Sequence, residues 1–307
     1  MTDFELHGVA TLEHLGVIRA VGEDAVKFLH GQLTQDLALL PVGQARLAAF
    51  CTPKGRMLAS FVLVKHSNEE VWMVCSRDVL APTLKRLSMF VMRAKVRLTD
   101  ASADLRLCGL LGRATIAAAD AAGATSPWTA VAAGPAHAIA LYPAGKTGRQ
   151  LWIAPLDAPL PQGDTVRAQD WAWSEVASGV ATVSAPLAEL FVPQMLNYES
   201  VGGVSFKKGC YPGQEVVARS QFRGTLKRRT YLAHSSAALQ AGEELFAGGD
   251  FEQPVGVVVQ AAQQPDGVAV ALLCLQTSAD MRTLCSQQAR DLQITVLDLP
   301  YALLEDI

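Results

Sequence analysis

The chain has 307 residues, of which 50% are hydrophobic, and a net charge of -3. This size allows sizeable cores in about two or three structural units, and the charge argues against a general attraction to nucleic acid or anionic membrane. No run approaches the roughly 18 to 20 uninterrupted apolar residues that cross a bilayer. Asp3 and Glu5 stand where a signal peptide needs basic residues. We therefore expect a cytoplasmic protein with no membrane partner.

The first hundred residues alternate between helical and strand-like patterns. Val26, Leu29, Leu33 and Leu37 recur on one face of a helix, and the alternating runs after them indicate an antiparallel meander. The expected elements are a helix at 22–40, strands at 44–51, 57–64 and 71–76, a helix at 77–92 and a strand at 94–98. Helices among strands favour an α+β arrangement.

A similar β-rich and then helical pattern follows, and short β runs occupy the end of the chain. The expected elements are a helix at 114–122, strands at 137–142 and 151–154, and a helix at 164–178 with Gly179 as its C-cap. After Arg229, short runs between Gly, Pro, Asp and Gln predict a small β-sandwich or β-barrel. We place the domain boundary between residues 226 and 227, so that the second domain is 227–307.

The six cysteines are spread along the chain without metal-ligand spacing. Each is expected to be a small, buried, reduced hydrophobe, and neither a metal site nor a resident iron–sulfur cluster is expected. Cys210 has unusual neighbours, because Lys208 and Gly209 precede it and Gly213 follows closely. Cations and the start of a helix near Gly213 would favour a thiolate. A tight interdomain turn with a buried, inert Cys210 is the alternative.

Four stretches carry a family resemblance: KKGCYPGQEVVAR (207–219), FVPQMLNYE (191–199), GEDAVKFLHGQLTQDL (22–37) and TPKGRMLASFVLV (52–64). The first two are similar to the signature of the YgfZ family, and the other two resemble its N-terminal half. Together with the C-terminal β pattern, the resemblance spans nearly the whole chain. This family shares a superfamily with the T-protein of the glycine cleavage system and with mitochondrial iron–sulfur assembly factors.

The resemblance implies both a fold and a role. The fold is α+β, with two interleaved α+β folate-binding subdomains in an aminomethyltransferase-like region, residues 1–226, and a small C-terminal β-barrel around a central cavity. The implied cofactor is tetrahydrofolate or a related reduced folate. The implied function is accessory: support of iron–sulfur cluster assembly or repair, and thereby of iron–sulfur-dependent tRNA modification. The implied partners are folate, iron–sulfur proteins or their assembly factors, and tRNA-modifying enzymes.

The resemblance also assigns site residues. Cys210 would be the reactive thiol, with Lys208 beside it. Trp171 would stack on the pterin or aminobenzoyl ring and Leu15 would line the same cavity, although Trp171, Trp173 and Leu15 are equally compatible with core packing. The remaining residues that the motif places at the functional surface are Gly209, Tyr211, Gly213, Gln214, Glu215 and Arg219.

The chain departs from the T-protein pattern at positions that matter for catalysis. Ala59 and Ser60 stand where the T-protein has an aspartate near folate N5, and neither can replace a carboxylate as a proton acceptor. Arg149 stands where a glutamate contacts the pterin, and Glu175 where an arginine holds the folate tail. We therefore expect an accessory binding protein rather than an aminomethyltransferase, with a different folate pose.

Two other functions stay open. A folate-dependent one-carbon transferase would need another acid or base, and Glu215 is the only nearby candidate in the motif. An RNA-binding module would show strongly salt-dependent tRNA affinity without folate. Seven basic residues could bind RNA phosphates, an acidic partner or the folate polyglutamate tail, or could form a solvated surface: Lys207, Lys208, Arg219, Arg223, Lys227, Arg228 and Arg229. We favour the tail or the partner.

Overall fold

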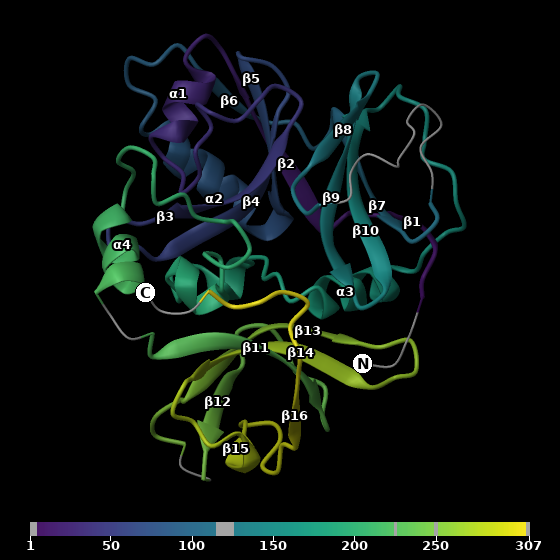
Figure 1. The fold of residues 1–307 in the computed structure, drawn as a ribbon, viewed down its shortest axis with the longest axis vertical. Coiled ribbons are helices and arrows are strands. Elements are labelled where there is room, and N and C mark those ends of the chain that lie inside the picture. Colours follow the sequence, from purple (N-terminus) through teal and green to yellow (C-terminus); the bar gives the residue numbers. More distant parts are fainter. Residues whose placement is uncertain (1–4, 115–125, 224–225, 249–250, 305–307) are drawn as a thin grey trace.

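The computed structural model describes residues 5–114, 126–223, 226–248 and 251–304. Within them, three antiparallel sheets form the framework. Figure 1 shows the first two sheets side by side, with the third sheet beneath them. The helix expected at 114–122 lies outside the described residues, except for Ala114.

The first sheet contains the predicted meander. Its strand order is β3 (Ala45–Cys51), β4 (Met57–Lys65), β5 (Glu70–Ser76), β2 (Leu15–Val21) and β6 (Arg97–Asp100). Helices α1 (Ala25–His30) and α2 (Arg77–Ser88) belong to this part of the chain. The meander is confirmed, whereas β2 is absent from the sequence prediction and β6 begins three residues later than the expected strand at 94–98.

The second sheet interleaves the two subdomains. Its order is β1 (Gly8–Thr11), β7 (Leu105–Leu111), β10 (Thr147–Pro155), β9 (Ala136–Ala144) and β8 (Ala130–Ala133). Strand β1 pairs with β7, although all the strands of the first sheet lie between them in the sequence. The N-terminal strand therefore belongs to the second subdomain. Helix α3 (Ala168–Ala177) follows, and Gly179 adopts a φ of 71° just beyond its end, as the expected C-cap requires.

The third sheet forms the C-terminal half-barrel. Its order is β15 (Leu284–Cys285), β12 (Glu244–Ala247), β13 (Gly256–Gln263), β14 (Ala269–Gln276), β11 (Arg228–Ser235) and β16 (Ile294–Leu297). Among the described strands, the edge strands β15 and β16 do not pair with each other, so the barrel is open. Helix α3 packs on β13 and β14, which joins the half-barrel to the second sheet (Figure 1).

The helix predicted at 22–40 is wrong over most of its length. Helix α1 ends at His30, and Leu33 instead forms a β-bridge with Phe50. Thr34 explains the change, because its backbone N–H donates to Ala49 and its hydroxyl donates to the Gly203 carbonyl. Pairing with β3 thus replaces the helical hydrogen bonds. Of the apolar side chains that suggested a helix, Leu29, Leu33 and Leu37 are nevertheless fully buried, and Val26 is half-buried.

The remaining elements are short helices between the strands. The short helices are η2 (Ala185–Leu187), η3 (Pro193–Leu196), η4 (Met281–Thr283) and α4 (Gln214–Phe222). One hydrophobic core runs continuously from Leu47 on β3 through Trp173 on α3 and Leu196 on η3 to Leu272 on β14. This continuity fixes α3 relative to both neighbouring sheets.

Candidate functional site

A cavity opens where the first two sheets meet α3. It has about 620 Å³ of space, a figure that includes its open mouth. Its walls are mainly apolar side chains of β4, β5 and β9, with a few polar groups. The lining includes Leu15, Ser60, Tyr142, Arg149, Trp171 and Glu175.

Trp171 and Leu15 both line this cavity, as the resemblance implied. Trp171 is also a core residue, being 2% exposed. Its ring packs directly against Gly109 of β7, where an added Cβ would lie 2.3 Å from Cζ3. The guanidinium carbon of Arg149 lies 4.7 Å from the centre of the ring. Trp171 therefore belongs both to the core and to the cavity wall. Its stacking on a ligand stays a prediction.

Arg149 places a buried cation in the cavity wall. Its Nε donates to Ser174 Oγ at 2.9 Å and its Nη1 donates to the Tyr142 carbonyl at 3.2 Å. Burial lowers the pKa of Arg149 to about 10, while the negative charge of Glu175 acts in the opposite direction. The guanidinium thus stays charged near neutral pH and is held in place by α3 and β9.

Glu175 supplies the cavity's carboxylate. His14 Nε2 lies 3.2 Å from Glu175 Oε1. Burial opposes the charge of His14, but the hydrogen bond and the charge of Glu175 raise its pKa. Ala59 is fully buried, and Ser60 Oγ accepts a hydrogen bond from the Val183 N–H at 2.9 Å. The position of the T-protein aspartate therefore carries no acid in this chain.

The Cys210 segment lies apart from the cavity. Cys210 is exposed, and no residue between Lys208 and Arg219 lines the cavity. Helix α4 begins directly after Gly213, as expected. Gly213 has a φ of 83°, and an added Cβ there would lie 2.4 Å from the Thr52 carbonyl oxygen, so only glycine fits this turn. The alternative of a buried Cys210 is wrong.

Lys208 is an internal anchor beside the exposed thiol. Its ammonium donates to the carbonyl of His30, the last residue of α1, and, at 3.0 Å, to the carbonyl of Leu33 just beyond the helix. It also lies 4.6 Å from the centre of the Tyr211 ring. Burial lowers the pKa of Lys208 to about 8, while the negative charges of Asp36 and Cys210 act in the opposite direction. Lys208 therefore fixes the loop that presents the thiol.

The other motif residues divide between core and surface. Tyr211 is buried, whereas Gly209, Glu215 and Arg219 are exposed and Gln214 is half-buried. Glu215 lies in the first turn of α4, outside the cavity. The structure thus separates the predicted residues into two sites, one around Trp171 and Leu15 and one around Cys210.

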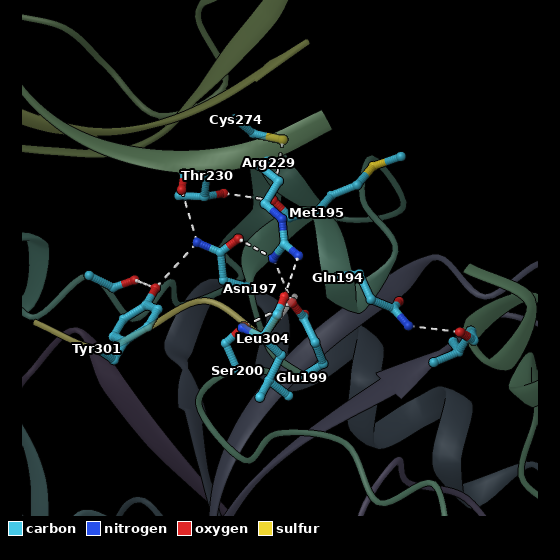
Figure 2. Close-up of polar contacts among 12 residues, drawn as sticks. Gln194, Met195, Asn197, Glu199, Ser200, Arg229, Thr230, Cys274, Tyr301 and Leu304 are labelled. Atoms are coloured by element: carbon cyan, nitrogen blue, oxygen red, sulfur yellow. Dashed lines mark hydrogen bonds and ion pairs between the residues drawn. The ribbon is translucent and has the colours of Figure 1, made fainter. Parts of the chain in front are cut away.

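The basic cluster is divided in the same way, because Arg229 is internal. Figure 2 shows its guanidinium facing Glu199 and Asn197, which belong to the FVPQMLNYE motif. Arg229 Nη1 lies 2.6 Å from Glu199 Oε1, and both side chains are almost completely buried. Asn197 has a φ of 59°, and its amide donates to the Thr230 carbonyl of β11 at 2.9 Å and to Tyr301 Oη at 3.3 Å.

This motif is therefore structural: it ties the half-barrel and the C-terminal segment to the body of the protein (Figure 2). This structural role was not predicted from the sequence. The only sign of it there is an Asn and a Glu on either side of a Tyr, ahead of a run of basic residues. Because Lys208 and Arg229 are buried, they do not belong to a basic surface. The other members of the basic cluster are Lys207, Arg219, Arg223, Lys227 and Arg228. Within the described chain, no group of three His, Cys, Asp or Glu side chains is placed to hold a metal ion.

Comparison with known proteins first defines the class. Residues 5–128 match the GCVT N-terminal domain family. The fold is similar to that of glycine cleavage system aminomethyltransferase T from Bartonella henselae, with a TM-score of 0.67 and 18% identity, covering 96% of this chain and 86% of that one. The chain thus has the aminomethyltransferase T fold.

The sequence relatives then define the family. The tRNA-modifying protein YgfZ of Cronobacter sakazakii is 30% identical, with 96% of this chain and 93% of the relative covered. The YgfZ protein of Escherichia coli O157:H7 is 28% identical with the same coverage. The chain belongs to the YgfZ family. None of its described helices is long and apolar enough to span a membrane.

Proposed function

We propose that this protein binds a reduced folate, such as tetrahydrofolate, in the cavity and serves tRNA modification by supporting the assembly or repair of iron–sulfur clusters. The cavity carries the proposal, since an aromatic ring, a buried cation and a carboxylate line a mainly apolar space. Its place in an aminomethyltransferase T fold supports a folate ligand, and the name of the relatives, tRNA-modifying protein, supports the role.

The same cavity favours an accessory role over one-carbon transfer. Ser60 lines the cavity and Ala59 is buried, so neither position supplies a carboxylate, and Glu175, the carboxylate of the cavity, is bonded to His14. Glu215, the alternative acid in the motif, is exposed on α4 outside the cavity. A proton acceptor must reach the reacting atoms within hydrogen-bond distance, and Glu215 is outside the space proposed for folate.

Cys210 is the proposed contact with client proteins. An exposed thiol on a loop anchored by Lys208 is accessible to another macromolecule, and a thiolate is a ligand for iron–sulfur clusters. Iron–sulfur proteins or their assembly factors, and the tRNA-modifying enzymes that depend on them, are the proposed partners. The proposed location is the cytoplasm, because the proposed role is in tRNA modification there.

Isothermal titration with tetrahydrofolate tests the ligand. We expect saturable binding of one folate per chain, weakened about tenfold or more in Trp171→Ala, because burial and ring contacts are lost. Phe222→Ala, an exposed aromatic on α4 outside the cavity, is the matched control and should bind normally. Absence of heat and of competition by any reduced folate with the wild type would refute folate binding.

Complementation tests the role. In a strain lacking this protein, we expect nucleosides made by iron–sulfur-dependent enzymes to fall in tRNA digests and to be restored by the wild type. Cys210→Ala should fail to restore them, whereas Cys285→Ala, which removes a buried thiol of the half-barrel, should succeed. Full restoration by Cys210→Ala would exclude the thiol from the role.

A further inference from the structure

Arg149 has hydrogen-bonding capacity that the protein does not use. Its Nε and Nη1 have acceptors, but Nη2 has none among the described residues, although the side chain is buried and lines the cavity. The indole N–H of Trp171, whose ring lies under the guanidinium, is also buried without a hydrogen-bond partner among the described residues. Buried donors are normally satisfied. This part of the wall therefore calls for an acceptor from a ligand.

Glu175 presents the opposite need. His14 occupies one of its carboxylate oxygens, and the other has no hydrogen-bond partner among the described residues. Its side chain is 16% exposed. Glu175 and Arg149 line the same cavity, yet the described structure contains no ion pair within 4.0 Å between them. A partly buried carboxylate with a free oxygen calls for donors from a ligand.

The two unmet needs restrict the ligand's chemistry. A simple anion would be attracted by Arg149 but repelled by Glu175. A simple cation would be attracted by Glu175 but repelled by Arg149. A neutral, planar group with a carbonyl next to N–H donors satisfies both. The 2-amino-4-oxo edge of a pterin has this pattern: an oxygen acceptor at position 4, then an N–H and an amino group.

We propose that Glu175 and Arg149 together read the 2-amino-4-oxo edge of the ligand, with Glu175 accepting from the amino group and N3–H and Arg149 donating to the 4-oxo group. This inference rests on the proposed folate binding and adds the orientation of the head group. Glu175 then decides specificity, because a compound without the 2-amino group loses one of the two donors that the carboxylate accepts from.

A pair of ligands tests this assignment: tetrahydrofolate and its 2-desamino analogue, in which hydrogen replaces the amino group. For the wild type we expect tetrahydrofolate to bind about 10- to 100-fold more tightly, the range for a hydrogen bond to a charged group. In Glu175→Gln the preference should fall below about threefold. Glu13→Gln, an exposed carboxylate outside the cavity, is the matched control and should keep the preference.

Arg149 is tested by a conservative change because it also supports the fold. Arg149→Lys keeps the charge but loses the planar guanidinium with its two parallel donors. We expect both ligands to bind this variant about tenfold more weakly. Thermal unfolding of the variant is measured alongside as a control for its stability. If the wild type binds neither ligand, the proposed folate function fails. If the wild type binds both equally, or Glu175→Gln weakens both equally or keeps the preference, folate binding stands and the reading of the edge by Glu175 is overturned.

Discussion

The cysteines show how position determines the chemistry of one residue type. Burial raises the pKa of Cys51, Cys75 and Cys274 to about 12, so these thiols stay protonated near neutral pH. Cys210 alone among the six is exposed. The sequence predicted buried, reduced thiols and distinguished Cys210 by its neighbouring lysine and glycines, but it left a buried Cys210 open as an alternative. It could not reveal that Cys210 lies apart from the cavity, which depends on tertiary structure.

Thiol titration follows from this difference. With Ellman's reagent at pH 7.5 we expect one fast-reacting thiol in the native protein, since burial limits access to the other five. Unfolding in guanidinium should reveal all six. Cys210→Ser should abolish the fast reaction, and Cys285→Ser should leave it unchanged. A second fast thiol in the native protein would contradict the burial of the others.

Lys208 should make stability depend on pH in the alkaline range. Its folded pKa is about 8 against an ordinary 10.5, so the unfolded chain binds more protons between these values and stability rises with pH there. Lys208→Met should be about 2 kcal/mol less stable at pH 7, because two carbonyls lose a charged donor. The gap between wild type and variant should widen from pH 8 to 10.5 in urea unfolding. Lys207→Met, an exposed neighbour, should show neither effect; a constant gap would argue against the shifted pKa.

At the scale of elements, periodicity predicts what is buried better than which backbone conformation buries it. Leu33 and Leu37 are fully buried as the pattern requires, but the chain carrying them is bridged to β3 rather than helical. That choice depends on Thr34 meeting Ala49 and Gly203, contacts between distant segments that a local pattern does not contain. The meander and α3 were predictable because their patterns agree with their tertiary contacts.

The two sheets of the body also meet through a histidine pair. His66, just after β4, has Nδ1 2.9 Å from Nε2 of His137 on β9, and its ring stacks on Trp72 with centroids 4.2 Å apart. Burial, together with the charge of His66, lowers the pKa of His137 to about 4. Glu70 and Arg19 are the charged groups near this pair, and they bind each other at 2.6 Å.

This pair should make the protein sensitive to acid. The unfolded chain binds a proton at His137 near its ordinary pKa of 6.5, and the folded chain does so only near 4, so stability falls as the pH falls through this window. Relative to His137→Gln, the wild type should lose about 2 kcal/mol between pH 6.5 and 4. Chemical denaturation at several pH values measures this loss. Equal losses in both proteins would show that His137 is protonated without cost.

At the scale of the whole molecule, part of the family signature holds the domains together. The FVPQMLNYE segment carries Asn197 and Glu199, which join β11 of the half-barrel to the body through Arg229 (Figure 2). Tyr301 extends the network by donating to the Gly179 carbonyl at 2.7 Å, next to Ser178 in the cavity wall. The sequence resemblance identified the segment, but a signature alone does not separate residues that support the fold from residues that perform chemistry.

Breaking this network should therefore be costly. Arg229→Met leaves Glu199 as a buried, uncompensated charge, and we expect a loss of about 3 to 5 kcal/mol in the free energy of unfolding. The double variant Arg229→Met with Glu199→Met should lose less than the sum of the two single losses, because each removes the other's unpaired charge. Urea unfolding followed by tryptophan fluorescence measures all three, with exposed Lys227→Met as the control. Additive losses, or a single loss below about 1 kcal/mol, would mean that apolar packing of α3 on the half-barrel joins the domains without help from the ion pair.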